Sequence, residues 1–169
     1  RGSALCLIMN FSRISLIFFI LVGLDQLSKI LITSALDEGA SLPLLPFLDL
    51  TLIFNTGIAF SLFDDYGPWG RWFISSFVAL ILFYLAKIIL TEKNLNSYES
   101  LALVLIFCGG AGNLIDRVFL GYVVDFIHVF YQNYSFYVFN FADSYITIGF
   151  TLYLIYIIFI GDNKKANAN

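Results

Sequence analysis

The most regular feature of the chain is a set of four long apolar stretches separated by polar segments. A helix that crosses a bilayer needs about 20 mostly apolar residues, and each stretch is long enough. The first begins as ISLIFFILVGL, and the second contains the uncharged run WFISSFVALILFYLA. The third contains LALVLIFCGGAGNLI, and the fourth is SYITIGFTLYLIYIIFIG. The pattern predicts four transmembrane helices, over residues 14–36, 70–90, 99–117 and 141–161.

The composition also indicates a membrane protein. Of the 169 residues, 60% are hydrophobic and 12% are charged, and the mean hydropathy is +0.87. Soluble domains average roughly 25% charged residues, so this chain has too little polar surface for a water-soluble particle. We expect one membrane-embedded domain over residues 1–169, in which residues 1–8 look like an expression remnant without function.

Charge and cysteine usage exclude several classes of partner. The net charge of −3 argues against nucleic acid. A single His and two distant cysteines, Cys6 and Cys108, argue against a disulfide framework and against a Cys/His metal site.

Lysine and arginine indicate how the helices are oriented, because these residues favour the cytoplasmic side of short loops. If both termini are cytoplasmic, three cations face outward, namely Lys29, Arg71 and Arg117. The other six face inward: Arg1, Arg13, Lys87, Lys93, Lys164 and Lys165. The first span has no small-residue cleavage site, so we expect it to remain as a helix. The sequence therefore predicts that both termini are cytoplasmic.

The two connections that this topology places outside are β-prone. Residues 37–70 contain the alternating run LDLTLIF, the segment NTGIAF and a DDYGPWG turn. Residues 118–139 are rich in Val, Phe and Tyr, which favour strands and suit the membrane interface. We expect short strands in both connections.

Polar residues of the spans gather toward the outer end of the predicted bundle. A charge at the centre of a membrane helix costs at least about 2.5 kcal/mol, so each such residue needs a reason. Each has a simple structural explanation when taken singly. These are an i, i+4 ion pair for Asp25 and Lys29, close packing for the glycines of CGGAGNLIDR, and helix capping for the polar residues of FNFADS. Independent caps and ion pairs need not lie at one depth, however. The sequence therefore predicts a polar site near the outer leaflet, from Asp25, Lys29, Asn55, Asn113, Asp116, Arg117, Asp125, Asn140 and Asp143.

Most nucleophilic and metal-dependent chemistry is excluded at this site. Neither HExxH nor GxSxG is present. Ser28 and Lys29 are adjacent and point in different directions on a helix, so they cannot form a dyad. We expect Cys108 to be a small buried residue and His128 to lie at the membrane interface.

Carboxylates remain as the reactive groups. Two carboxyls in a partly dry site share a proton and divide into an acid and a base, which activates water without a cofactor or a metal. Asp25 is a weaker candidate because Lys29 neutralises it. The outer candidates are Asp116, which has Arg117 beside it, Asp125 and Asp143.

A small transporter or proton carrier is the alternative interpretation, since intramembrane carboxylates are expected there too. Against it, the inner halves of the four spans are nearly pure Leu, Ile, Phe and Val, whereas a conduction path needs polar groups on the cytoplasmic side. A scaffold without activity would leave Asp125, in the apolar segment VVDFI, unexplained.

Five motifs, in this order, resemble those of the bacterial lipoprotein signal peptidases (signal peptidase II). They are DQLSK (25–29), NTGIAF (55–60), GGAGNLIDR (109–117), VVDFI (123–127) and FNFADS (139–144). The GxGD signature of presenilin-type aspartyl proteases is absent. The resemblance implies an all-α integral membrane fold, with four transmembrane helices and a small extracytoplasmic β-cradle and loop.

The resemblance also implies a function and roles for residues. It implies a monomeric aspartic endopeptidase of the bacterial cytoplasmic (inner) membrane, in contact with membrane lipid, without cofactor or metal, and inhibited by globomycin. The implied substrate is a diacylglyceryl-modified prolipoprotein, cleaved immediately before the lipid-modified Cys. The catalytic pair corresponds to Asp125 and Asp143. Positions that support the site or bind substrate correspond to Asp25, Lys29, Asn55, Gly109, Asn113, Asp116, Arg117 and Asn140.

Overall fold

The helices of the computed structural model, which describes residues 10–57, 67–92 and 95–161, follow the four predicted spans. The bounds are α1 Phe11–Ala35, α2 Gly67–Thr91, α3 Ser97–Phe119 and α4 Phe141–Ile155, and a π-helical segment, η2 (Tyr156–Gly161), continues α4. All four helices are long and apolar enough to cross a membrane. The prediction of four spans is therefore confirmed, with small shifts at the helix ends.

The predicted DDYGPWG turn is wrong where the structure describes it. Residues 67–70 form the first turn of α2, and residues 64–66 lie outside the described residues. A proline and glycines are compatible with this position, because the first N–H groups of a helix have no intrahelical acceptor. Residues 58–60 of the NTGIAF motif also lie outside the described residues.

The β-prone connections form one four-stranded antiparallel sheet, as predicted. The strands are β1 (Ser41–Leu45), β2 (Leu48–Asn55), β3 (Val123–Tyr131) and β4 (Tyr134–Phe139), in the order β1-β2-β3-β4. In the central pair, Asn55 lies opposite Val123 and Ile53 lies opposite Asp125. This register brings Asn55 and Asp125, which are 70 positions apart, to the same end of the sheet.

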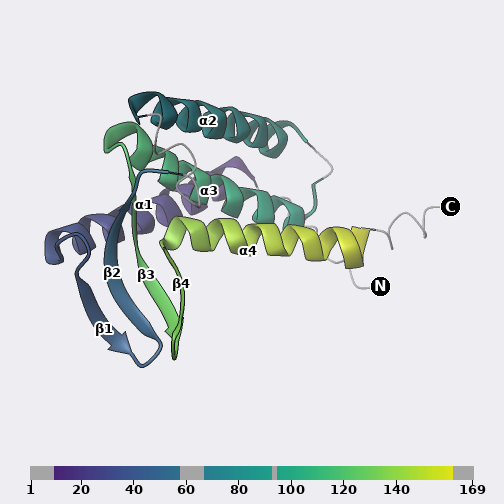
Figure 1. Ribbon diagram of the computed structural model, residues 1–169. Helices are drawn as coiled ribbons and strands as arrows, with labels where there is room; N and C mark the ends of the chain where they lie inside the picture. Colours follow the sequence, from purple (N-terminus) through teal and green to yellow (C-terminus); the bar gives the residue numbers. More distant parts are fainter. Residues whose placement is uncertain (1–9, 58–66, 93–94, 162–169) are drawn as a thin grey trace.

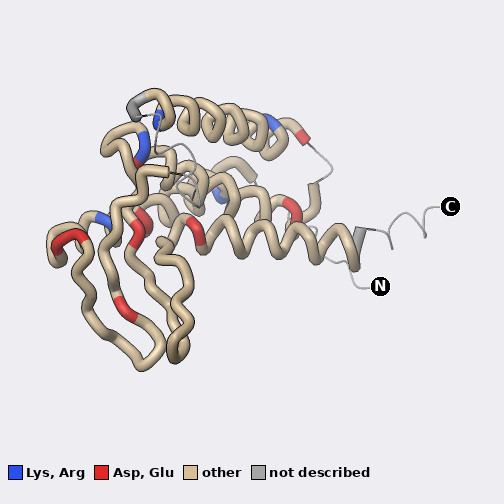
Figure 2. Tube along the Cα trace, in the orientation of Figure 1, with Lys and Arg blue, Asp and Glu red and all other residues tan. Residues whose placement is uncertain are grey.

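The sheet lies at the end of the helices opposite the C-terminal end of α4 (Figure 1). Most of the acidic residues in the described chain lie at or near this end (Figure 2). A small buried core joins the sheet to α1, through Ile32 of the helix and Leu52, Val124 and Phe126 of the strands. This core fixes the start of β3 against the helices.

Helix α3 is the centre of the bundle. Half of the residues in its most apolar 18-residue stretch are buried (50%), compared with 17–22% in the corresponding stretches of the other three helices. Close packing against α4 depends on glycines, because a Cβ at Gly109 would clash with the carbonyl oxygen of Ala142. A Cβ at Gly149 would lie 2.7 Å from the carbonyl oxygen of Ala102. The packing explanation of Gly109 is therefore confirmed, and this packing places the first turn of α4.

Candidate active site

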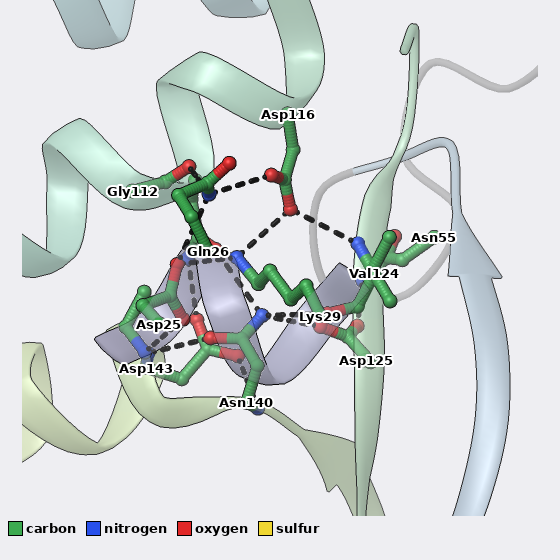
Figure 3. A network of polar contacts seen from close by, with 12 residues as sticks. Asp25, Gln26, Lys29, Asn55, Gly112, Asp116, Val124, Asp125, Asn140 and Asp143 are labelled. Carbon is green, nitrogen blue, oxygen red and sulfur yellow. Dashed lines mark hydrogen bonds and ion pairs between the residues drawn. The ribbon is translucent and has the colours of Figure 1, made fainter. Parts of the chain in front are cut away.

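Asp125 and Asp143 lie on either side of Asn140, where the sheet joins the helices (Figure 3). Asp125 is the third residue of β3 and is 3% exposed. Asp143 is the third residue of α4 and is half-buried. Because β4 pairs with β3 and leads directly into α4, the chain returns to the start of β3 as α4 begins. Strand pairing therefore brings the two carboxyl groups into one site.

Asn140 connects the two carboxyl groups. It is fully buried, at 0% exposed, and its side-chain Nδ2 donates to Oδ1 of Asp125 at 2.6 Å. Its backbone N–H donates to Oδ2 of Asp143 at 3.2 Å, and its Oδ1 accepts the backbone N–H of Asp143 at 2.9 Å. The last two bonds form a reciprocal capping box at the start of α4. The capping explanation of the FNFADS motif is thus correct, and the cap is also part of the site.

Two further asparagines donate hydrogen bonds to the other oxygen of each carboxyl group. Asn55 donates from Nδ2 to Oδ2 of Asp125 at 2.9 Å. Asn113 donates from Nδ2 to Oδ1 of Asp143 at 2.8 Å. Together with Asn140, these residues supply an N–H donor to every oxygen of both carboxyl groups.

The direction in which each side-chain amide points follows from the donor that its oxygen accepts. Oδ1 of Asn113 lies 3.1 Å from Nζ of Lys29, and an ammonium group can only donate. The amide oxygens of Asn140 and Asn55 accept backbone N–H groups at 2.9 and 3.2 Å. Each amide therefore presents its NH2 group to an aspartate, and the site stabilises negative charge on the pair.

Lys29 lies at the centre of a buried ion triad. Its Nζ is 2.9 Å from Oδ2 of Asp25 and 2.8 Å from Oδ2 of Asp116. The three residues are 0%, 3% and 1% exposed in chain order. With the bond to Asn113, the three ammonium hydrogens of Lys29 each have an acceptor. The predicted Asp25–Lys29 ion pair is therefore present, with a second carboxylate added.

The two carboxylates of the triad also position the backbone next to the aspartate pair. Asp25 accepts the N–H of Ala142 at 2.9 Å, and Asp116 accepts the N–H of Val124 at 3.2 Å. Ala142 and Val124 directly precede Asp143 and Asp125 in the chain. The triad thus connects α1 and α3 to the backbone on both sides of the candidate site.

Asp116 and Arg117 are neighbours in the sequence, but their side chains have different hydrogen-bond partners. Adjacent residues on a helix point about 100° apart, and Asp116 turns toward Lys29. Arg117 instead donates from Nη2 to the carbonyl oxygen of Gly57 at 3.3 Å, and its Nε is buried with no partner among the described residues. Its guanidinium still interacts electrostatically with the aspartate pair.

Gln26 is a site residue that the sequence analysis missed. Its Nε2 lies 2.9 Å from Oδ1 of Asp116, 3.2 Å from Oδ2 of Asp25 and 3.2 Å from the carbonyl oxygen of Gly112. It lies on the same part of α1 as Asp25 and Lys29, so its position inside the DQLSK motif could have indicated that it belongs to the site.

Burial raises the pKa of the Asp125 carboxyl to about 6, and the nearby Asp143 adds to this increase. The hydrogen bonds from Asn55 and Asn140 act in the opposite direction, as does the charge of Lys29. Asp125 therefore holds a proton more readily near neutral pH than an ordinary aspartate does.

The remaining reactive residues lie apart from the aspartate pair. Cys108 is 1% exposed and packs with Val22 and Val104. His128 Nε2 lies 2.7 Å from the hydroxyl oxygen of Ser135. Within the described residues, no group of three or more His, Cys, Asp or Glu side chains is arranged to hold a metal ion.

Comparison with known proteins identifies the family. Residues 17–159 match the family model described as signal peptidase (SPase) II. The chain belongs to the signal peptidase II family. It is 42% identical over 148 residues to a lipoprotein signal peptidase of Acinetobacter baumannii, covering 88% of this chain and 84% of that protein. A lipoprotein signal peptidase of Streptococcus pyogenes serotype M1 is 42% identical over 137 residues, covering 80% of this chain and 86% of that protein.

A solved structure supports the fold. It is a bacterial membrane enzyme determined by the in meso method at 2.3 Å, with 33% sequence identity and a TM-score of 0.78, and the match covers 92% of each chain. The predicted family and fold class are therefore confirmed. The chain is a multi-pass membrane peptidase of lipoprotein processing, which excludes the transporter interpretation.

Proposed function

We propose that this signal peptidase is an aspartic endopeptidase, in which Asp125 and Asp143 form the catalytic pair. The observation that carries the proposal is the joint binding of both carboxyl groups by Asn140, with an amide donor on each remaining oxygen. Two carboxyl groups that are bound by one residue and that interact electrostatically are suited to divide into an acid and a base acting on one water molecule.

The two aspartates differ in a way that suits separate roles. Asp143 is half-buried and is reached by solvent, so it takes the proton from the attacking water. Asp125 is 3% exposed and has a raised pKa, so it donates a proton to the peptide that is cleaved. The water oxygen bonds to the carbonyl carbon, the C–N bond breaks, and the products are a carboxylate and an amine. No acyl-enzyme forms, and the two carboxyls titrate as a coupled pair.

The substrate is a prolipoprotein whose Cys already carries diacylglyceryl, and the bond cleaved lies immediately before that Cys. Its support comes from the family and from the side chain of Asp143, which is partly exposed and can therefore be reached by a peptide. Arg117 contacts the substrate, and the other supporting residues hold the pair: Asp25, Lys29, Asn55, Gly109, Asn113, Asp116 and Asn140.

The cleavage site faces the outer side of the bacterial inner membrane, with both termini in the cytoplasm. Support comes from the excess of Lys and Arg toward the termini, and from the sheet lying at the opposite end of the helices (Figure 1). The chain acts as a monomer of one domain in contact with lipid. Reporter fusions at Asn169 and Asn94 should read as cytoplasmic and one at Gly67 as external. A cytoplasmic reading at Gly67 would contradict this orientation.

The decisive experiment is cleavage of a purified diacylglyceryl-modified prolipoprotein by Asp125→Asn and Asp143→Asn. General acid–base catalysis contributes about 10²- to 10⁴-fold, so each variant should approach inactivity while still inserting and binding substrate. Asp49→Asn is the matched control, because Asp49 lies in the same sheet outside the site and should keep normal activity. Mass spectrometry of the product should find the lipid-modified Cys at its N-terminus. Substantial cleavage by both site variants would refute the aspartic mechanism.

A further inference from the structure

Arg71 of α2 binds the end of α3 that faces the sheet. Its guanidinium donates from Nε to the carbonyl oxygen of Arg117 at 2.7 Å and from Nη2 to the carbonyl oxygen of Val118. Carbonyls in the last turn of a helix lack intrahelical donors and carry the negative end of the helix dipole. A side chain from α2 therefore caps α3 directly beside the candidate site.

The same guanidinium contacts the turn that follows α3. Gly121 has a φ of 95°, and a Cβ built there would lie 2.9 Å from Nη1 of Arg71. Strand β3 begins two residues later at Val123 and carries Asp125. Cζ of Arg71 also lies 4.9 Å from the ring centroid of Trp72, which limits the freedom of the guanidinium. Arg71 thus contacts two consecutive parts of the chain, the end of α3 and the turn that leads to β3.

We propose that Arg71 is a positioning residue for the cleavage reaction. It sets the backbone at the end of α3 and in the following turn, and thereby the placement of Arg117 and Asp125. Helix α2 lies along α3 at the edge of the molecule, and the Arg71 side chain reaches from α2 to the end of α3 beside the site (Figure 1). The role requires the planar fork of a guanidinium, because two carbonyls one residue apart are bound by two differently directed N–H groups. The inference rests on the proposed catalytic role of Asp125.

The test compares Arg71→Lys and Arg71→Gln with the unsubstituted chain on a diacylglyceryl-modified prolipoprotein, with kcat and KM expressed per folded enzyme. Displacing a catalytic group by about 1 Å costs up to about 10²-fold in rate, so we expect kcat to fall at least about tenfold in both variants. KM should change much less. Lysine keeps the charge without the fork and should not restore kcat. Lys87→Gln is the matched control, because Lys87 is an exposed cation on the same helix, and its kcat should be unchanged.

The outcomes separate this inference from the proposed function. A normal kcat in Arg71→Lys would overturn the inference, because charge alone would then suffice. Failure of both Arg71 variants to fold would also overturn it, since Arg71 would then be a folding residue. Asp125→Asn is measured in parallel on the same substrate. Cleavage by Asp125→Asn refutes the proposed function, whereas an inactive Asp125→Asn with normal Arg71 variants refutes only the positioning role.

Discussion

Removing the cation of the buried triad should destabilise the protein strongly, and the structure sets the size of the effect. Lys29→Met keeps the length of the side chain but leaves Asp25 and Asp116 without their shared ammonium group. Removing one partner of a buried ion pair typically costs about 3–5 kcal/mol. Each carboxylate keeps a backbone N–H and Gln26 as donors, so the variant removes the compensating charge and leaves these hydrogen bonds in place.

A triple variant separates a stranded charge from lost packing. Asp25→Asn/Lys29→Met/Asp116→Asn leaves no charge in the buried triad, so it should lose less stability than Lys29→Met alone.

The assay is unfolding by SDS in detergent micelles, followed by circular dichroism. Lys87→Met is the control, since it removes an exposed lysine and should change stability by less than about 0.5 kcal/mol. A deficit below about 1 kcal/mol for Lys29→Met, or a triple variant that is no more stable than Lys29→Met, would refute the ion-triad assignment.

Three further predictions follow from single contacts. Burial raises the pKa of the Asp125 carboxyl in the folded chain to about 6, above the ordinary value of 3.8. The stability that the protonated carboxyl contributes is therefore fully present below pH 3.8 and is lost as pH rises through 6. Between pH 4 and pH 8, the stability of Asp125→Asn relative to the unsubstituted chain should therefore improve by up to about 3 kcal/mol, and a pH-independent difference would contradict this. Gly109→Ala should lower both the melting temperature and cleavage, because its Cβ would clash with the carbonyl oxygen of Ala142 in α4. Gly23→Ala is the control, because a Cβ there has nothing within 4 Å, and equal melting curves for the two variants would refute the prediction. Asp116→Asn should reduce cleavage but retain measurable turnover, because Asp25 still pairs with Lys29; a folded variant as inactive as Asp125→Asn would place Asp116 in the reaction itself.

The sequence by itself determined the spans, the strands and the family. Hydropathy over about 20 residues and alternation along a strand are local properties, so they can be recognised without knowledge of tertiary contacts. The motifs also identified most of the polar residues that the structure brings together. Their clustering was predictable because helices that each cross the membrane once bring alternate connections of the chain to the same side.

Only the tertiary structure decided which polar group contacts which. Rotation of α3 turns Asp116 toward Lys29 and away from Arg117, although Arg117 is its neighbour in sequence. Asn140 looks like an ordinary helix cap until strand pairing places Asp125 within 2.6 Å of its amide. The same limit applies to Gln26 and Arg71, whose polar contacts reach another helix through their side chains. These partners are 46 to 90 positions apart, and helix rotation and strand register, which set such contacts, depend on the packing of the whole chain.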